Sequence, residues 1–176
     1  TFDDPSPFLA SFLTFPYAYG AASAFRNWSD HRAPFNTPPL STLEVLSRDG
    51  GFALAEPVEL GEAPTPDADY RLVDADTLGA FQLSLSAHGL GAEKSIAEVF
   101  APAWRGDALW VYAGPAEETA WVWMLELADF AYTDQLMAVV QSNPHLDVAA
   151  NGKRIVLTGG DARPQFLIDA GAAFLL

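Results

Sequence analysis

Apolar side chains are densest in two neighbouring segments, residues 108–113 and 119–128. Both segments are apolar at nearly every position, which is typical of central strands that are covered on two faces. Residues 114–118 between them begin with a Gly-Pro pair, which marks a turn. The pattern predicts an antiparallel pair of buried strands.

A second hairpin is predicted at residues 146–149 and 153–158. Asn151 and Gly152 lie between these runs and form the strongest short hairpin signal in the chain, because both residue types adopt positive φ readily.

Helical spacing of apolar residues predicts helices at residues 92–100 and 132–141, and residues 163–174 are expected to form a terminal helix or an extended tail. Alternation of apolar and polar residues predicts strands at residues 52–60 and 78–87. Residues 70–73 have the composition of an edge strand.

The first 39 residues have a different pattern. Ser6 and Pro7 fit the start of a helix, which we expect to end before Pro16, and residues 17–28 are expected to form a second helical stretch. Residues 5–25 carry no charge and are long enough to cross a bilayer, but proline, glycine and hydroxyl groups interrupt them. A basic flank is also lacking. A packed helical pair is therefore expected, and no membrane span.

From residue 92 onward the predicted order is helix, strand, strand, helix, strand, strand, helix. Separate hairpins with helices between them predict an α+β fold with a mainly antiparallel sheet and helices packed on it. A ferredoxin-like split arrangement is one topology that fits this order. We expect one α+β domain at residues 40–176, preceded by an N-terminal helical arm and a proline-rich loop at residues 1–39.

The charge balance narrows the class of function. The 176 residues include 23 acidic and 9 basic side chains, a net charge of −14, and no cysteine. Non-specific nucleic-acid binding needs clustered Lys and Arg, so nucleic acid is not an expected partner. The lack of cysteine excludes thiolate metal sites, a cysteine nucleophile and disulfides. It is compatible with an exported or periplasmic location, which we favour slightly, and with a cytoplasmic one.

Candidate catalytic groups are few. The histidines are His31, His88 and His145, and no two have the spacing of four residues that places two ligands on one metal. His88 is the best candidate base, because Ser84 and Ser86 would share its face of the predicted strand. Each histidine also fits a solvated turn.

Other reactive groups are weaker candidates. Thr1 resembles a loose chain end more than an N-terminal nucleophile. The acidic pairs Asp67/Asp69 and Asp74/Asp76 offer oxygen ligands to Ca²⁺, but they lack the glycine and the closing glutamate of an EF-hand loop. A solvated acidic loop is expected there, with calcium binding left open. No cofactor and no metal are expected.

Aromatic residues on the two central strands form the one site-like feature. Trp110 and Tyr112 share a face of the first strand, Trp121 and Trp123 share a face of the second, and Trp104 is close in sequence. If the turn brings these faces together, four rings form one cross-strand patch. That patch is either a sheet face covered by helices or an exposed surface for a partner protein or a carbohydrate.

Our hypothesis from the sequence is a non-catalytic, acidic interaction or accessory domain. It would dock a protein partner through the aromatic sheet surface or through its N-terminal arm, with these partner-binding residues: Trp104, Trp110, Tyr112, Trp121 and Trp123. One alternative is a small hydrolase or carbohydrate-active enzyme that uses dispersed carboxylates such as Glu98, Glu126 and Asp129. Another is a carrier of a small apolar ligand. The identity of the partner and the oligomeric state stay open.

Overall fold

A computed structural model describes most of the chain, namely residues 13–26, 36, 39, 41–47 and 56–176. The chain divides into two compact units. Residues 1–55 and 79–102 form one, called here the helical unit, and residues 56–78 and 103–176 form the other, called the sheet unit. The division of the chain at residue 40 stays a prediction.

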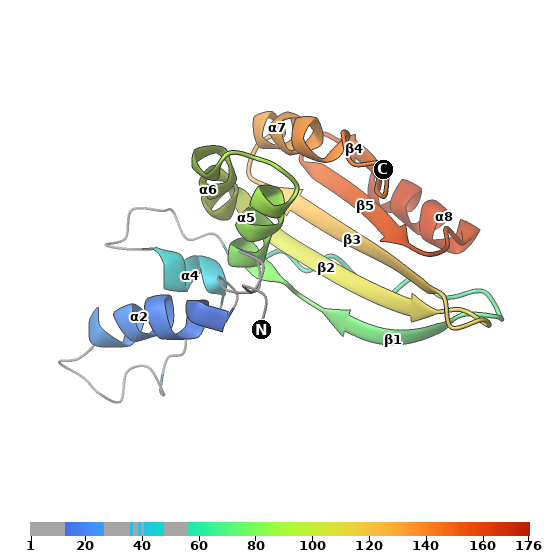
Figure 1. The fold of residues 1–176 in the computed structure, drawn as a ribbon, viewed down its shortest axis with the longest axis horizontal. Helices are drawn as coiled ribbons and strands as arrows, with labels where there is room; N and C mark the ends of the chain where they lie inside the picture. Colours follow the sequence, from blue (N-terminus) through green and yellow to red (C-terminus); the bar gives the residue numbers. More distant parts are fainter. Residues whose placement is uncertain (1–12, 27–35, 37–38, 40, 48–55) are drawn as a thin grey trace, which may run out of the picture. The chain divides into compact units, whose positions relative to one another are not determined.

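The sheet unit contains a five-stranded sheet in the order β1-β2-β3-β5-β4, drawn in Figure 1. Its strands are β1 (Arg71–Asp76), β2 (Trp104–Ala113), β3 (Thr119–Leu127), β4 (Asp147–Asn151) and β5 (Arg154–Gly160). All four neighbouring pairs are antiparallel. The α+β class with an antiparallel sheet is confirmed. Strands β3 and β4 run in the same direction on either side of β5 and are joined through a helix, which is a split βαβ unit. The order β1-β2-β3 on the other side of the sheet follows the chain instead, so the split arrangement covers only this part of the sheet.

Both predicted hairpins are confirmed. Gly114 and Glu117 close the β2–β3 turn, in which the Gly114 amide donates to the Glu118 carbonyl oxygen (2.9 Å) and Glu117 has a positive φ of 62°. This is the three-residue hairpin loop that ends in a bulged residue with left-handed conformation. In the β4–β5 hairpin Asn151 pairs with Arg154 and belongs to β4, so the turn residues are Gly152, with a φ of 60°, and Lys153. The hairpin is therefore present, but its turn lies one residue later than predicted.

Two helices belong to the sheet unit, α7 (Phe130–Val140) and α8 (Gln165–Phe174). Asp129 begins α7 by accepting a hydrogen bond from the Ala131 amide (2.9 Å). Helix α8 packs against β3 and β5. Gly171 lies close to β5, since a Cβ at that position would stand 2.9 Å from Val156 Cγ1.

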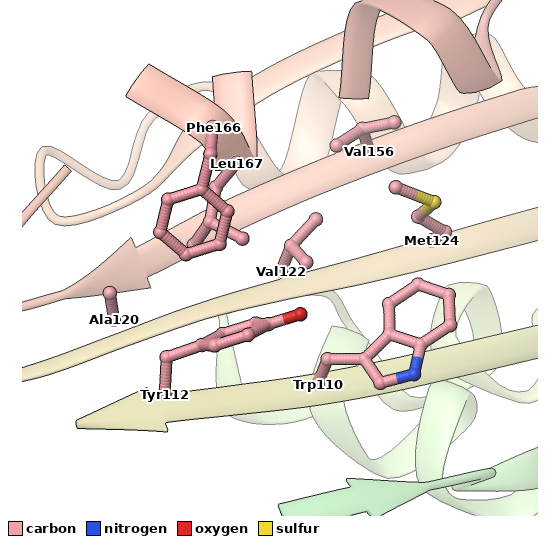
Figure 2. Close-up of a cluster of buried hydrophobic side chains, with 8 residues drawn as sticks. All are labelled: Trp110, Tyr112, Ala120, Val122, Met124, Val156, Phe166 and Leu167. Atoms are coloured by element: carbon pink, nitrogen blue, oxygen red, sulfur yellow. The ribbon is translucent and has the colours of Figure 1, made fainter. Parts of the chain in front are cut away.

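A buried apolar cluster joins α8 to one face of the sheet, as Figure 2 shows. Phe166 and Leu167 of α8 meet side chains from three strands: Trp110, Tyr112, Ala120, Val122, Met124 and Val156. The Phe166 ring lies edge-on to Tyr112, with ring centroids 5.0 Å apart. The densest apolar run of the sequence therefore becomes the centre of the core.

The described part of the helical unit includes one helical run from Leu13 to Arg26. It includes the π-helical turn η1 (Pro16–Gly20) and helix α2 (Ala21–Arg26). The prediction that the helix ends before Pro16 is wrong, because Pro16 is the first residue of η1 and the proline occupies the start of that turn. No helix among the described residues is both long enough and apolar enough to span a membrane.

Two further helices of this unit are α4 (Thr42–Leu46), whose N-cap is Ser41, and α5 (Gly79–Gly89). The strand predicted at residues 78–87 is wrong, since this segment is α5. The buried residues Ala80, Leu83 and Ala87 are three and four residues apart, which is the spacing of one face of a helix. The alternation of Leu83 and Leu85 suggested a strand because both leucines are buried in that helix. Thr42 Oγ1 accepts a hydrogen bond from the Phe81 amide (3.2 Å) and satisfies part of the first turn of α5.

Helix α6 (Lys94–Ala103) follows, so the helix predicted at residues 92–100 is confirmed, and it continues through Pro102 to Ala103. The strand predicted at residues 52–60 is wrong for residues 56–60, which have no regular structure. There the Val58 amide donates to the Arg105 carbonyl oxygen (2.7 Å). Residues 52–55, Thr1, His31 and the helix start at Ser6 and Pro7 lie outside the described residues.

Candidate functional site

The ladder between β2 and β3 decides how the aromatic rings are grouped. Each ring lies opposite a small or aliphatic residue: Trp110 with Val122, Tyr112 with Ala120, Trp121 with Val111, and Trp123 with Leu109. Directly opposite residues share a face of the sheet. Trp110 and Tyr112 therefore lie on one face and Trp121 and Trp123 on the other, so the expected single patch of four rings is wrong.

Four of the five predicted partner-binding residues are buried. Trp104, Trp110, Tyr112 and Trp123 are between 0% and 6% exposed, whereas Trp121 is half-buried. The Trp121 ring lies over Gly159, where a Cβ would stand 2.1 Å from Cζ2 of the indole. A partner that docks on the folded sheet unit can reach Trp121, but it cannot reach the other four without rearranging the core.

The buried carboxylate of Asp107 links two of these tryptophans. Trp104 Nε1 donates to Oδ1 of Asp107 (2.7 Å), and Trp123 Nε1 donates to Oδ2 (2.9 Å). The Leu78 amide also donates to Oδ2 (2.8 Å). Asp107 is only 4% exposed, and burying a charge is costly unless it is hydrogen-bonded. The carboxylate thus fixes the indoles as structural groups of the sheet unit.

Sequence reasoning missed Asp107. The available signal was a single carboxylate directly before the apolar run at residues 108–113, three residues after Trp104. The donors from Trp123 and Leu78 are 16 and 29 residues away along the chain, so the pattern alone could not identify them.

Tyr112 has a similar structural role on the opposite face. Its hydroxyl donates to the Pro64 carbonyl oxygen (2.7 Å), and burial raises the pKa of Tyr112 to about 12. Figure 2 shows this hydroxyl pointing along the sheet within the apolar cluster. The neutral hydroxyl therefore ties the segment before β1 to the centre of the sheet.

Two groups at the turn end of the sheet, the half-buried Tyr70 and the exposed Asp161, have shifted pKa values. Desolvation first, and then the nearby Glu118 carboxylate, raise the pKa of Tyr70. The Thr119 amide and hydroxyl donate to Oδ2 of Asp161 (3.0 and 2.9 Å) and lower the pKa of that carboxyl. The shift at Tyr70 therefore comes first from burial, and the shift at Asp161 comes from its hydrogen bonds with Thr119.

The histidines do not form a catalytic arrangement in the part of the chain that the structure describes. His88 ends α5, with Nδ1 2.9 Å from the Ala92 carbonyl oxygen. The expected strand face shared with Ser84 and Ser86 is wrong, because those residues lie on a helix. His145 lies in the turn before β4. Among the described residues no group of three or more His, Asp or Glu side chains is placed to hold a metal ion.

The carboxylates considered for hydrolysis each have a local partner. Glu126 pairs with Arg154 (3.5 Å), and Glu98 pairs with Lys94 (3.8 Å) one helical turn away. Asp129 caps α7. These contacts are sufficient to explain the three residues structurally.

Two acidic residues lie in a strand and not in the expected acidic loop. Asp74 and Asp76 belong to β1, where Asp74 Oδ1 accepts from the Ala75 amide (2.9 Å) and Asp76 Oδ1 accepts from the Thr77 amide (2.7 Å). One oxygen of each carboxylate is thus engaged by the amide of the residue that follows it.

The N-terminal helical run has two apolar sides. On one, Phe15 and Tyr19 gather with Phe81 of α5, and the Phe15 and Phe81 ring centroids are 4.1 Å apart. On the other, large apolar side chains are exposed: Leu13 by 55%, Tyr17 by 80% and Phe25 by 72%. This exposed series, Leu13, Tyr17, Ala21 and Phe25, repeats every four residues and is called here the exposed stripe.

Comparisons of this chain with protein-family models, with curated proteins and with solved structures found no match. The function is therefore inferred from the arrangement of its own residues.

Proposed function

We propose that the protein is a non-catalytic interaction domain that docks a protein partner through the exposed stripe of its N-terminal helical run. The observation that carries this proposal is the exposure of Leu13, Tyr17 and Phe25 on one side of a helix whose other side is packed. Residues four apart lie on the same face of a helix, so these side chains line one continuous strip.

The residue types of the stripe suit a protein interface. Large exposed apolar patches mark interaction surfaces more often than isolated apolar residues do. Aromatic side chains, tyrosine above all, are enriched where partners bind. Phe15, Tyr19 and Phe81 support the stripe from behind, so the helix presents a preformed surface.

The partner expected from this chemistry offers an apolar groove or strip of its own. The stripe has no charged side chain, whereas the chain as a whole has a net charge of −14. Long-range attraction would therefore favour a partner with basic residues around that groove, and it would act mainly on the association rate. Trp121, the half-buried member of the aromatic set, is a second candidate contact.

Site-specific photocrosslinking tests this proposal. A photoreactive phenylalanine analogue is placed at Tyr17 or at Phe25 in full-length protein expressed in its native host. The matched control carries it at Phe130, which is 62% exposed in the sheet unit. We expect the same partner band from positions 17 and 25 and none from position 130.

The purified partner is then tested for binding to Tyr17→Ser/Phe25→Ser and to Phe130→Ser by calorimetry. The stripe variant should lose at least tenfold in affinity, and the control should bind like the wild type. A partner that crosslinks equally from position 130, or that binds the stripe variant normally, would contradict the proposal.

A further inference from the structure

Strand β1 is at one end of the sheet, and β2 is its only strand neighbour among the described residues. All six of its residues are exposed, including Leu72 and Val73, whose exposed fractions are 42% and 44%. An exposed edge with apolar residues is a template for pairing with another strand. The outer edge of β1 therefore needs something that blocks pairing.

The hydrogen-bonding direction of each β1 residue follows from the β2–β3 turn. Gly114 bonds toward β3, and bonding direction alternates along an antiparallel strand, so Leu109 and Val111 of β2 direct their peptide groups toward β1. They face Asp76 and Asp74. The peptide group of Ala75, between these two, must therefore point to the outer edge.

The donor on that edge is already occupied. The Ala75 amide donates to Oδ1 of Asp74 at 2.9 Å, and the next outward amide, of Thr77, donates to Oδ1 of Asp76 at 2.7 Å. An added strand would have to displace these carboxylates before it could accept from either amide.

We infer that Asp74 keeps the β1 edge from pairing with the β1 edge of a second copy of this chain. This inference concerns the sheet unit and does not depend on the exposed stripe. The second copy is the occupant that the strand itself fits. In the antiparallel register that places residue 71 opposite residue 76, Arg71 meets Asp76 of the other copy and Leu72 meets Ala75.

In this register the Ala75 amide is a central donor, since Ala75 and Leu72 of the two copies exchange hydrogen bonds twice across the two-fold axis. Arg71 is available for the new ion pair, because its contact with Glu117 is long (3.9 Å) and both side chains are largely exposed. The Asp74 cap removes the donor that would hold the centre of the ribbon together.

The experiment compares single variants of Asp74 by analytical ultracentrifugation at moderate salt over a wide range of protein concentration. The wild type should sediment as a monomer. Asp74→Val removes the cap and should sediment at twice the mass of one chain. Asp74→Asn removes the charge but keeps an oxygen acceptor for Ala75, so it should stay monomeric. The control, Asp69→Val, removes one carboxylate ahead of the strand and should also stay monomeric.

Further substitutions in the Asp74→Val background test the register. Adding Ala75→Pro removes the outward donor without removing a bond to β2, and it should restore the monomer. Adding Arg71→Asp should also restore the monomer, and adding Asp76→Arg to that variant should recover the dimer. Far-ultraviolet circular dichroism checks that each variant is folded.

A wild-type protein that dimerises through β1, or a folded Asp74→Val variant that stays monomeric, would overturn the inference. Dimerisation of Asp74→Asn would show that charge alone blocks the edge and would equally overturn the role given to the cap.

Discussion

The buried rings of β2 and β3 and the rings of the exposed stripe have opposite surroundings. Trp110 and Trp123 are 5% and 6% exposed, whereas Tyr17 and Phe25 are 80% and 72% exposed. The polar atoms of Trp104 and Trp123 donate to Asp107, and the Tyr112 hydroxyl donates to the Pro64 carbonyl oxygen, all inside the fold. Aromatic content alone therefore does not locate a binding surface, and the two regions should respond differently to the same substitution.

The largest difference is expected between Trp110→Ala and Tyr17→Ala. Removing a buried indole creates a cavity and should lower the free energy of unfolding by about 3–5 kcal/mol. Tyr17→Ala, at an exposed position, should stay within about 0.5 kcal/mol of the wild type. Urea unfolding followed by circular dichroism measures both, and similar losses would contradict the contrast.

Asp107→Ala tests the buried polar link. It leaves the indole donors of Trp104 and Trp123 and the Leu78 amide without this acceptor, and each unsatisfied buried donor costs about 1–3 kcal/mol. We expect a loss of at least about 3 kcal/mol in urea unfolding. The matched control, Asp129→Ala, removes a helix cap and should cost only about 1 kcal/mol. Equal effects would contradict the role given to Asp107.

Tyr112→Phe should cost about 1–2 kcal/mol, because it leaves the Pro64 carbonyl without its donor. The pH dependence has a definite sign. The folded pKa of about 12 exceeds the ordinary value of 10, so this stabilisation is complete below pH 10 and is lost as the pH rises toward 12. Tyr112→Phe has no phenol at this position, so the part of the stability loss that comes from ionisation of Tyr112 should be absent. Urea unfolding of both proteins at pH 9 to 12 measures the difference between their free energies of unfolding.

The smallest effect is expected at Asp161. Its carboxyl pKa is lowered by the Thr119 amide and hydroxyl, so it contributes stability above its unfolded pKa and loses it as the pH falls through the lower folded value. The melting temperature of Asp161→Asn should therefore decrease less steeply than that of the wild type as the pH is lowered. If the melting temperatures of the two proteins decrease identically with pH, Asp161 does not make this contribution to stability.

The sequence predicted the elements better than their contacts. The strands β2 and β3 and the Asn151-Gly152 hairpin were predictable because composition and turn residues specify them locally. Helix α5 was not, because alternating Leu83 and Leu85 fit a strand as well as a buried helix.

The grouping of the rings depended on one feature of the turn. The bulged residue Glu117 sets the register that places Trp110 opposite Val122, and a shift of one residue would have put all four rings on the same face. Asp107 and the exposed stripe also depended on contacts between distant segments, which the pattern of a single chain does not contain.

Hydroxyl-radical footprinting of the free, folded protein tests the central contrast most directly. In the folded state we expect rapid oxidation of Tyr17 and Phe25 and strong protection of Trp110 and Trp123. In denaturant all four residues should react, which provides the control. Oxidation of Trp110 and Trp123 in the folded protein as fast as that of Tyr17 and Phe25 would contradict the account.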